Sequence, residues 1–321
     1  MVKVGIIGLG GISQAHREAW AQIPEAAVTA VCDIREEKVR EAAEATGGRP
    51  WLDFEAMLAE EELDILDICL PTGLHADTAV RALNRGLHVL TEKPVALRRE
   101  DVARIYDAAR KNGRRFMVAQ VLRFWREYEL LREAIRTERY GQLLSGQMSR
   151  LGNAPGWSWD NWMRDPKRSG LVPFDLHIHD LDFLIYTLGR PENMICHRAR
   201  QDAQDYLHVV YEYPGCFIST EAAWYDCAFP FRASYRFQFE RALMEYLGGK
   251  LSIYLPGGEV LTPDDETGAP ENGINLPSTN AYFNEIRYFT DCVLAGKDCD
   301  RVKPEELECV LELIARIDGK A

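Results

Sequence analysis

Short apolar runs alternate with helix-forming stretches over the first 120 residues of this 321-residue chain. The apolar runs lie at residues 2–7, 26–33, 63–71, 87–94 and 115–120, and the helix-forming stretches at 13–23, 35–45, 75–86 and 99–113. Buried strands that alternate with helices of this length are typical of a parallel, doubly wound sheet. The pattern therefore predicts an α/β fold that begins with a Rossmann domain over residues 1–122.

The pattern changes after residue 122. Residues 206–213, 216–225 and 231–246 alternate between apolar and polar side chains, with glycine and proline turns between them, which predicts an antiparallel meander. Helices are expected at 280–294 and 304–318, with the second packing back on the Rossmann domain. We expect residues 123–321 to form a second, α+β domain that binds substrate and, through its aromatic-rich sheet, another subunit.

The turn after the first predicted strand, Gly8-Leu9-Gly10-Gly11-Ile12-Ser13, has the spacing of a dinucleotide-binding loop. The first glycine permits the tight turn, the second lets the backbone approach a pyrophosphate, and the helix that follows offers unpaired N–H groups. Ser13 replaces the third glycine and is small enough for close helix–strand packing. We therefore expect cofactor contacts from Gly8, Gly10, Gly11 and Ile12.

Other cofactor contacts are expected where the remaining strands end, because ligands bind at the carboxyl ends of parallel strands. These residues are Pro71, Thr72, His75, Glu92, Lys93 and Gln120. Asp33 ends the second predicted strand, where a carboxylate binds the adenosine ribose; a cap of the next helix is the alternative. NAD is expected over NADP because Asp33 would repel a 2′-phosphate. Arg35 could neutralise that phosphate, so NADP remains open.

The stretch FDLHIHDLD, residues 174–182, allows two structures. On a strand, Asp175, His177 and His179 would share one face and suit a zinc ion. On a helix, at about 100° per residue, the two histidines point about 160° apart and cannot bind one ion. A helix is favoured, since apolar residues recur at its spacing and a glycine and a proline follow: Ile178, Leu181, Ile185, Leu188, Gly189 and Pro191. We therefore predict no metal site here.

Composition narrows the possible partners and the compartment. The 50 acidic residues exceed the 38 basic ones, for a net charge of −12, which argues against nucleic acid or an anionic membrane surface as partner. No apolar run has the length of a membrane span, and the N-terminus lacks a signal-peptide pattern. Eight cysteines are scattered singly, which is typical of reduced thiols. We therefore expect a cytoplasmic protein.

Four stretches resemble the glucose–fructose oxidoreductase / inositol dehydrogenase / rhizopine-catabolism (Gfo/Idh/MocA) family: GIIGLGGISQAH, LPTGLHADTAVRALNRGLHVLTEKPVA, DLHIHDLD and AYFNEIRYFTDCVLAGK. The resemblance covers nearly the whole chain, and the EKP tripeptide is its most specific element. It implies a Rossmann domain followed by a domain with a large, mostly antiparallel open sheet, which often forms dimers or tetramers. It also implies NAD- or NADP-dependent oxidation or reduction of a carbinol on sugars, cyclitols or related polyols.

The same resemblance implies a catalytic set. It maps the family's catalytic lysine onto Lys93 and its D-x-x-x-H motif onto Asp175 and His179. A histidine can take the hydroxyl proton, an ammonium stabilises the developing negative charge, and the aspartate orients either of them. Lys93 as sole proton donor is the alternative. The family often reads GGG ahead of the aspartate, whereas residues 170–174 here read GLVPF, so we expect a bulkier wall on the substrate side.

Substrate contacts are expected from Asp175, His179, Arg123, Trp162 and Arg164, the last two in a loop that also contains two further tryptophans. Packing of the loop and solvation of its charges are the alternatives for these side chains. Two other functions remain open. One is a metal-dependent hydrolase built on the HIHD stretch, and the other is a nucleotide or sugar sensor without catalytic activity.

Overall fold

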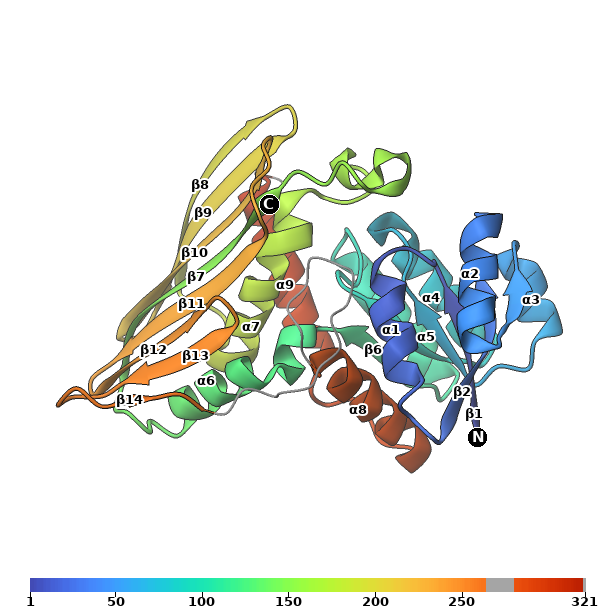
Figure 1. Cartoon of the computed structure of the whole chain (residues 1–321), viewed down its shortest axis with the longest axis horizontal. Coiled ribbons are helices and arrows are strands. Elements are labelled where there is room, and N and C mark those ends of the chain that lie inside the picture. Colours follow the sequence, from blue (N-terminus) through green and yellow to red (C-terminus); the bar gives the residue numbers. More distant parts are fainter. Residues whose placement is uncertain (264–279, 320–321) are drawn as a thin grey trace. The chain divides into compact units, whose positions relative to one another are not determined.

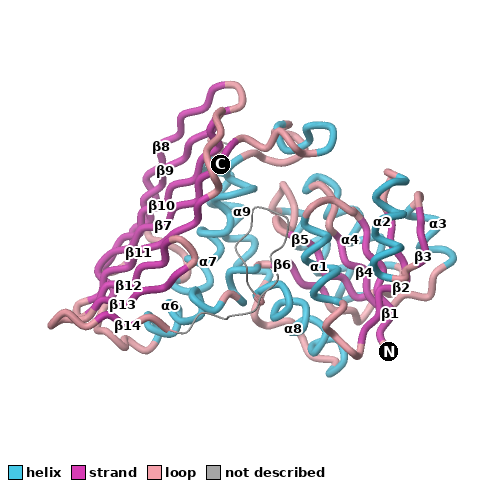
Figure 2. The backbone as a smooth tube through the Cα atoms, in the orientation of Figure 1, coloured by secondary structure: helices cyan, strands magenta, loops and turns pink. Residues whose placement is uncertain are grey.

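The computed structural model describes residues 1–263 and 280–319, which form two compact units (Figure 1). Of these residues, 1–121 and 280–308 belong to the first unit, and 122–263 and 309–319 to the second. Strands and helices alternate in the first unit, whereas the second is dominated by one large sheet (Figure 2). None of the described helices is long and apolar enough to span a membrane.

The first unit contains a parallel sheet with the strand order β3-β2-β1-β4-β5-β6. Its strands are β1 (Val2–Ile7), β2 (Ala26–Cys32), β3 (Arg49–Trp51), β4 (Ile65–Ile68), β5 (His88–Glu92) and β6 (Phe116–Ala119). Its helices are α1 (Ile12–Trp20), α2 (Glu36–Thr46), α3 (Phe54–Glu60), α4 (His75–Asn84), α5 (Glu100–Lys111) and α8 (Ala281–Ala295). This strand order confirms the predicted Rossmann domain, and it reverses between β1 and β4, where such sheets bind ligands.

Apolar runs form the central strands because both faces of the sheet are covered. All four residues of β4 are buried, and so are four of the five residues of β5. Such strands carry continuous apolar runs rather than alternating ones. Asp67 is the exception within β4, a fully buried carboxylate between Leu66 and Ile68.

The helix α8 corrects the predicted domain division, which placed all of residues 123–321 in the second domain. In the structure α8 belongs to the first unit, where it packs against α1. Arg287 of α8 also forms an ion pair with Glu25, at 2.6 Å. The next helix, α9 (Pro304–Ile317), passes from the first unit into the second at Cys309.

The second unit contains an eight-stranded sheet in the order β14-β13-β12-β11-β7-β10-β9-β8. Its strands are β7 (Leu143–Asn153), β8 (Asn193–Gln201), β9 (Gln204–Tyr213), β10 (Cys216–Tyr225), β11 (Arg232–Phe239), β12 (Ala242–Leu247), β13 (Lys250–Tyr254) and β14 (Val260–Leu261). Only β7 and β10 pair in parallel, so the predicted large, mostly antiparallel sheet is confirmed.

One face of this sheet is covered, by α6 (Arg126–Arg136) and α7 (Ile178–Leu188) (Figure 1). Every second residue of β9 is buried there, which is the period of a strand. Among the described residues no helix covers the opposite face. Large apolar side chains are exposed on that open face, including Ile195 and Phe217, which are 46% and 51% exposed.

Candidate active site

The turn between β1 and α1 has the geometry of a dinucleotide cradle. Gly8 has a φ of +87°, and a Cβ there would lie 2.6 Å from the carbonyl of Cys69, so only glycine fits. The Ser13 hydroxyl is buried and donates a hydrogen bond to the Gly10 carbonyl at 2.7 Å. The helix begins at Ile12, one residue before the predicted stretch. The N–H groups of Ser13 and Gln14 already donate to the Gly10 and Gly11 carbonyls at 3.2 and 3.1 Å, so the helix would attract a phosphate mainly through the dipole at its N-terminus.

Asp33 lies directly after β2 and beside this turn. Its carboxylate accepts hydrogen bonds from the backbone N–H of Leu9 at 2.7 Å and of Arg35 at 2.9 Å. The Arg35 guanidinium forms two more, at 2.9 and 2.8 Å. Burial opposes ionisation of this carboxyl, but the Arg35 and Leu9 hydrogen bonds outweigh it and lower the pKa of Asp33. An anionic carboxylate is thus fixed at the edge of the cradle, already paired with the one cation that was expected to compete with it.

The other strand ends differ in what they offer a ligand. Thr72 is buried and Pro71 is partly buried, both at the turn before α4. Gln120, after β6, is 2% exposed, and its Nε2 has no hydrogen-bond partner among the described residues. A buried amide that lacks a partner is costly and is a reasonable place for a ligand acceptor. His75 instead is buried with its nitrogens 2.7 Å from the Pro94 and Leu70 carbonyls. It therefore supports the loops rather than facing a ligand.

Lys93 follows β5 at the same edge of the sheet and is partly exposed. Its peptide bond to Pro94 is cis. The preceding residue, Glu92, is almost buried, and both oxygens of its carboxylate are engaged. Oε2 accepts the backbone N–H of Lys93 at 2.9 Å, and Oε1 lies 3.0 Å from Nε2 of His16. Glu92 thus points into the domain rather than toward a cofactor.

The FDLHIHDLD stretch is helical, as predicted, with one π-helical turn at Pro173–His177 that leads into α7. His177 is fully buried, and its Nε2 lies 2.7 Å from the Tyr211 hydroxyl of β9. Burial, assisted by the charge of Arg150, lowers the pKa of His177 to about 3. Asp175 and His179 are partly exposed instead. The two histidines therefore have different environments, and His177 belongs to the core.

Two buried ion pairs hold α7 in place. Arg123 contacts Asp182 through two hydrogen bonds, at 2.9 and 2.7 Å, and its guanidinium lies over the ring of Tyr186. Arg150 of β7 pairs with Asp180 at 2.9 Å. Arg123 is 1% exposed and committed to its carboxylate. Its role is therefore to position the helix, whereas the sequence had predicted a contact with substrate.

Residues 154–172, between β7 and the turn before α7, form a loop that contains Trp157, Trp159 and Trp162 and that we call the tryptophan loop. It lies beside an open hollow of about 510 Å³. Trp157, Arg164, Tyr225 and Asp226 are among its lining residues. Trp157 is 68% exposed, so its indole is available for contact. Trp162 is partly buried and does not line the hollow. Arg164 thus lines the hollow together with Trp157, a different tryptophan from the one that was expected to contact substrate.

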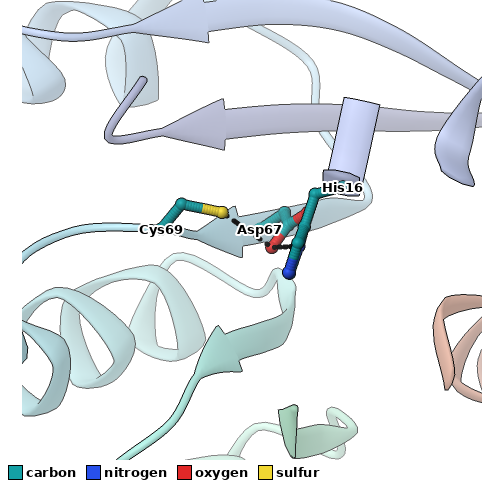
Figure 3. A group of neighbouring side chains, drawn as sticks. All are labelled: His16, Asp67 and Cys69. Atoms are coloured by element: carbon teal, nitrogen blue, oxygen red, sulfur yellow. Dashed lines mark hydrogen bonds and ion pairs between the residues drawn. The ribbon is translucent and has the colours of Figure 1, made fainter. Parts of the chain in front are cut away.

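His16, Asp67 and Cys69 are the one group among the described residues with metal-ligand spacing (Figure 3). Their polar atoms are already used. His16 Nδ1 lies 2.9 Å from Asp67, and the indole N–H of Trp20 donates to the same carboxylate at 2.7 Å. Burial raises the pKa of the Cys69 thiol to about 12, which disfavours the thiolate that a metal needs. Hydrogen bonding accounts for this group better than a metal ion does.

No local pattern in the sequence predicted this cluster or the two buried ion pairs that hold α7. The signal was present in part, since Asp67 interrupts the apolar run 63–71 and His16 sits in a helix beside it. The sequence could not show that these two residues are partners, because His16 and Asp67 are 51 positions apart.

Comparisons with known proteins agree with this geometry. Residues 2–120 match the family model described as the oxidoreductase family with NAD-binding Rossmann fold, and residues 128–242 match the GFO/IDH/MocA C-terminal domain. D-glucoside 3-dehydrogenase of Escherichia coli K12 is 30% identical over 194 residues, 59% of this chain and 55% of that protein. Myo-inositol 2-dehydrogenase of Thermotoga maritima is 28% identical over 59% of this chain and 55% of its own length. The chain thus spans about half the length of these relatives.

Solved structures extend the likeness to the whole fold. Levoglucosan dehydrogenase, in complex with NADH and levoglucosan, has a TM-score of 0.84 at 19% identity, covering 100% of this chain and 97% of that one. An oxidoreductase from Agrobacterium radiobacter in complex with NAD+, L-tartaric acid and magnesium also scores 0.84, at 16% identity over 100% and 96%. Together with the two family models, which cover both units, these matches establish that the chain belongs to the Gfo/Idh/MocA oxidoreductase family.

Proposed function

We propose that this protein is an NAD(P)-dependent oxidoreductase that transfers a hydride between nicotinamide and a carbinol or keto carbon of a sugar, cyclitol or related polyol. The observation that carries the proposal is the dinucleotide cradle at Gly8–Ile12, with Lys93 at the same edge of the sheet. The relatives named D-glucoside 3-dehydrogenase and myo-inositol 2-dehydrogenase support the reaction class and the kind of substrate.

The residues of the first unit fit a dinucleotide. A side chain at Gly8 would collide with the Cys69 carbonyl, so glycine is required for the tight turn, whereas a Cβ at Gly10 would meet nothing within 4 Å and the space there is open to a pyrophosphate. The orphaned amide of Gln120 suits a polar group of the ligand. Asp33 would bind the adenosine ribose, which favours NAD. Arg35 already contacts the Asp33 carboxylate, so with NAD bound the guanidinium and the ribose would share this carboxylate. If Arg35 instead turned toward a 2′-phosphate, the site would accept NADP.

The proposed chemistry needs three side chains. When bound, the nicotinamide supplies the hydride acceptor or donor. His179 takes the proton from the substrate hydroxyl, or returns it in the reverse direction. The Lys93 ammonium stabilises the negative charge that develops on the same oxygen, and Asp175 orients one of these two groups. The partial exposure of all three supports these roles, because a group that meets substrate must be reachable.

A polyol substrate is supported by the hollow beside the tryptophan loop. An exposed indole, Trp157, can lie against sugar C–H groups, and Arg164 and Asp226 can exchange hydrogen bonds with hydroxyls. Asp175 and His179 remain expected contacts of the reacting hydroxyl. The stretch GLVPF, residues 170–174, places bulky apolar side chains directly before Asp175, where the family often has three glycines. These side chains would restrict the size or orientation of the substrate.

We also propose that the protein associates with copies of itself and works in a reducing compartment. The open face of the eight-stranded sheet exposes Ile195, Phe217 and Leu247, and a homodimer or homotetramer would bury them. All eight cysteines are free thiols, which is typical of the cytoplasm.

The proposal is tested by titrating the protein with NAD(H) and NADP(H), and then measuring nicotinamide absorbance with a panel of sugars, inositols and keto-sugars. We expect cofactor binding, and turnover with at least one polyol. Replacing His179→Ala should lower turnover about 10²- to 10⁴-fold while cofactor affinity changes little. Cofactor binding without turnover of any substrate would indicate a sensor. Turnover that needs no nicotinamide and is lost when a chelator is added would indicate a metal hydrolase.

A further inference from the structure

A chain of four polar side chains runs through the core of the first unit. The indole N–H of Trp20 donates to Asp67 at 2.7 Å, and Asp67 contacts His16 Nδ1 at 2.9 Å. His16 Nε2 lies 3.0 Å from Oε1 of Glu92. The chain joins α1, β4 and the end of β5 (Figure 3 shows its His16–Asp67 link). It then continues to the backbone, since Oε2 of Glu92 accepts the N–H of Lys93 at 2.9 Å.

Both nitrogens of His16 face carboxylates, and this fixes its charge. A carboxylate accepts hydrogen bonds and does not donate them, so each ring nitrogen must carry a proton and the ring is an imidazolium. Burial opposes that charge, but Asp67 outweighs it and the pKa of His16 is raised well above its ordinary value. His16 and Asp67 are fully buried and the Glu92 side chain is 9% exposed, so the imidazolium compensates two carboxylates that water does not reach.

Holding a helix on a sheet does not require such a chain. Buried ions lose their hydration, and apolar side chains of similar volume often stabilise a fold as well or better. What apolar side chains cannot do is hold a carboxylate in one orientation at the end of β5. At the end of β5 the four hydrogen-bonded side chains act on the next residue, because Glu92 accepts the backbone N–H of Lys93.

We propose that the Asp67–His16–Glu92 chain is a positioning device for Lys93. The His16 imidazolium holds the Glu92 carboxylate so that its second oxygen fixes the backbone at Lys93, and the ammonium is thereby aimed from the end of β5. His16 and Glu92 are positioning residues, not catalytic ones. Their kinetic effect rests on the proposed function, in which Lys93 stabilises charge on the substrate oxygen.

The kinetic test compares His16→Gln, Glu92→Gln and the double variant. Each single change should lower kcat about 10²-fold, the loss expected when a reacting group is displaced by about 1 Å, with little change in the Kd for NAD. Because both residues act through one chain, the double variant should be no slower than the slower single variant. His88→Gln is the matched control, a half-buried histidine at the opposite end of β5, and it should retain wild-type kcat.

The pH profile separates positioning from packing. Without the imidazolium, only the charge and backbone N–H of Lys93 still offset the burial of Glu92, so the pKa of Glu92 should rise. The acidic limb of kcat should therefore move to higher pH in His16→Gln, and this shift should be absent from the double variant. The other ionisable groups that act on Glu92 or His16 are the same in both variants: Asp67 of β4, Cys69 directly after β4, His75 of α4, Lys93, and Tyr282 of α8.

Two measurements do not depend on turnover. Infrared spectroscopy at neutral pH should show the C=O stretch of protonated buried carboxyls in His16→Gln and not in the wild type. The double variant keeps Asp67, so its spectrum should lack only the part of this signal that comes from Glu92. Acetylation of Lys93 by acetic anhydride, mapped by mass spectrometry, should change in His16→Gln and Glu92→Gln and not in His88→Gln. If these signals change while no polyol is turned over, the proposed function fails and the positioning chain stands.

The opposite results would overturn the proposal. Unchanged Lys93 acetylation in folded variants would show that the chain does not position this residue. Additive losses of kcat with an unmoved acidic limb would show that His16 and Glu92 only contribute packing. If His16→Gln does not fold, Glu92→Gln alone decides, because it keeps the shape of the side chain and removes only its charge; wild-type kcat and acetylation in that variant would refute the inference.

Discussion

The buried His177 predicts a specific acid sensitivity. Its ring is neutral in the folded protein, with Nε2 against the Tyr211 hydroxyl, and its pKa is lowered to about 3. In the unfolded chain a histidine binds its proton near pH 6.5. Because the folded pKa is the lower one, the stabilisation is complete above pH 6.5 and is lost as the pH falls from 6.5 toward 3. Over that interval the unfolded state binds one proton more than the folded state.

The size of the effect follows from the displacement of the pKa. Each pH unit below about 6.5 should remove about 1.4 kcal/mol from the free energy of unfolding, and the whole shift corresponds to about 5 kcal/mol. His177→Phe removes the titration and keeps an aromatic ring in the core. It also leaves the Tyr211 hydroxyl without this partner, which should cost about 1–3 kcal/mol at every pH. The variant should therefore be the less stable protein near neutrality and the more stable one below about pH 5.

Urea denaturation of the wild type and of His177→Phe, between about pH 7 and pH 4.5, measures this directly. Other groups titrate in both proteins, so the difference between the two free energies isolates His177. His197→Phe, at an exposed position on β8, is the control and should follow the wild type. Parallel curves for wild type and His177→Phe would refute the assignment of His177 to the core.

Three further predictions concern the cradle and the helix supports. Gly8→Ala should abolish NAD binding, measured calorimetrically, because the added Cβ collides with the Cys69 carbonyl; retained affinity would show that the turn is not a cradle. Asp33→Ala should raise the affinity for NADP relative to NAD, and an unchanged ratio of the two Kd values would remove Asp33 from cofactor selection. Arg150→Met should lower the free energy of unfolding by about 3–5 kcal/mol, because it leaves Asp180 buried without its cation, and adding Asp180→Leu should restore most of that loss.

Local patterns predicted most of the Rossmann unit. Continuous apolar runs such as residues 65–68 form strands because both faces are covered, and the glycine at Gly8 is required by a close contact with Cys69, directly after β4. The helical period of Ile178, Leu181 and Ile185 identified the α7 helix, and all three are buried. These features depend on residues that are near one another in sequence.

Contacts between distant residues could not be read in this way. The spacing of His177 and His179 excluded a shared ion, but only the fold shows that His177 enters the core against Tyr211. Arg123 was expected to meet substrate because it follows the last Rossmann strand, yet Asp182, 59 positions later, neutralises it in a buried pair. Buried polar partners are chosen by tertiary packing, and no local period encodes them.

The most direct test of the central claim follows hydride transfer itself. The protein is incubated with NADH deuterated at nicotinamide C4 and with keto-sugars and keto-inositols, and the products are analysed by mass spectrometry, for the wild type and for Lys93→Met and His179→Ala. We predict deuterium on the new carbinol carbon of at least one product with the wild type, and a large loss of this transfer in both variants. Absence of deuterium from every product, although NADH binds, would contradict the account, and so would undiminished transfer in both variants.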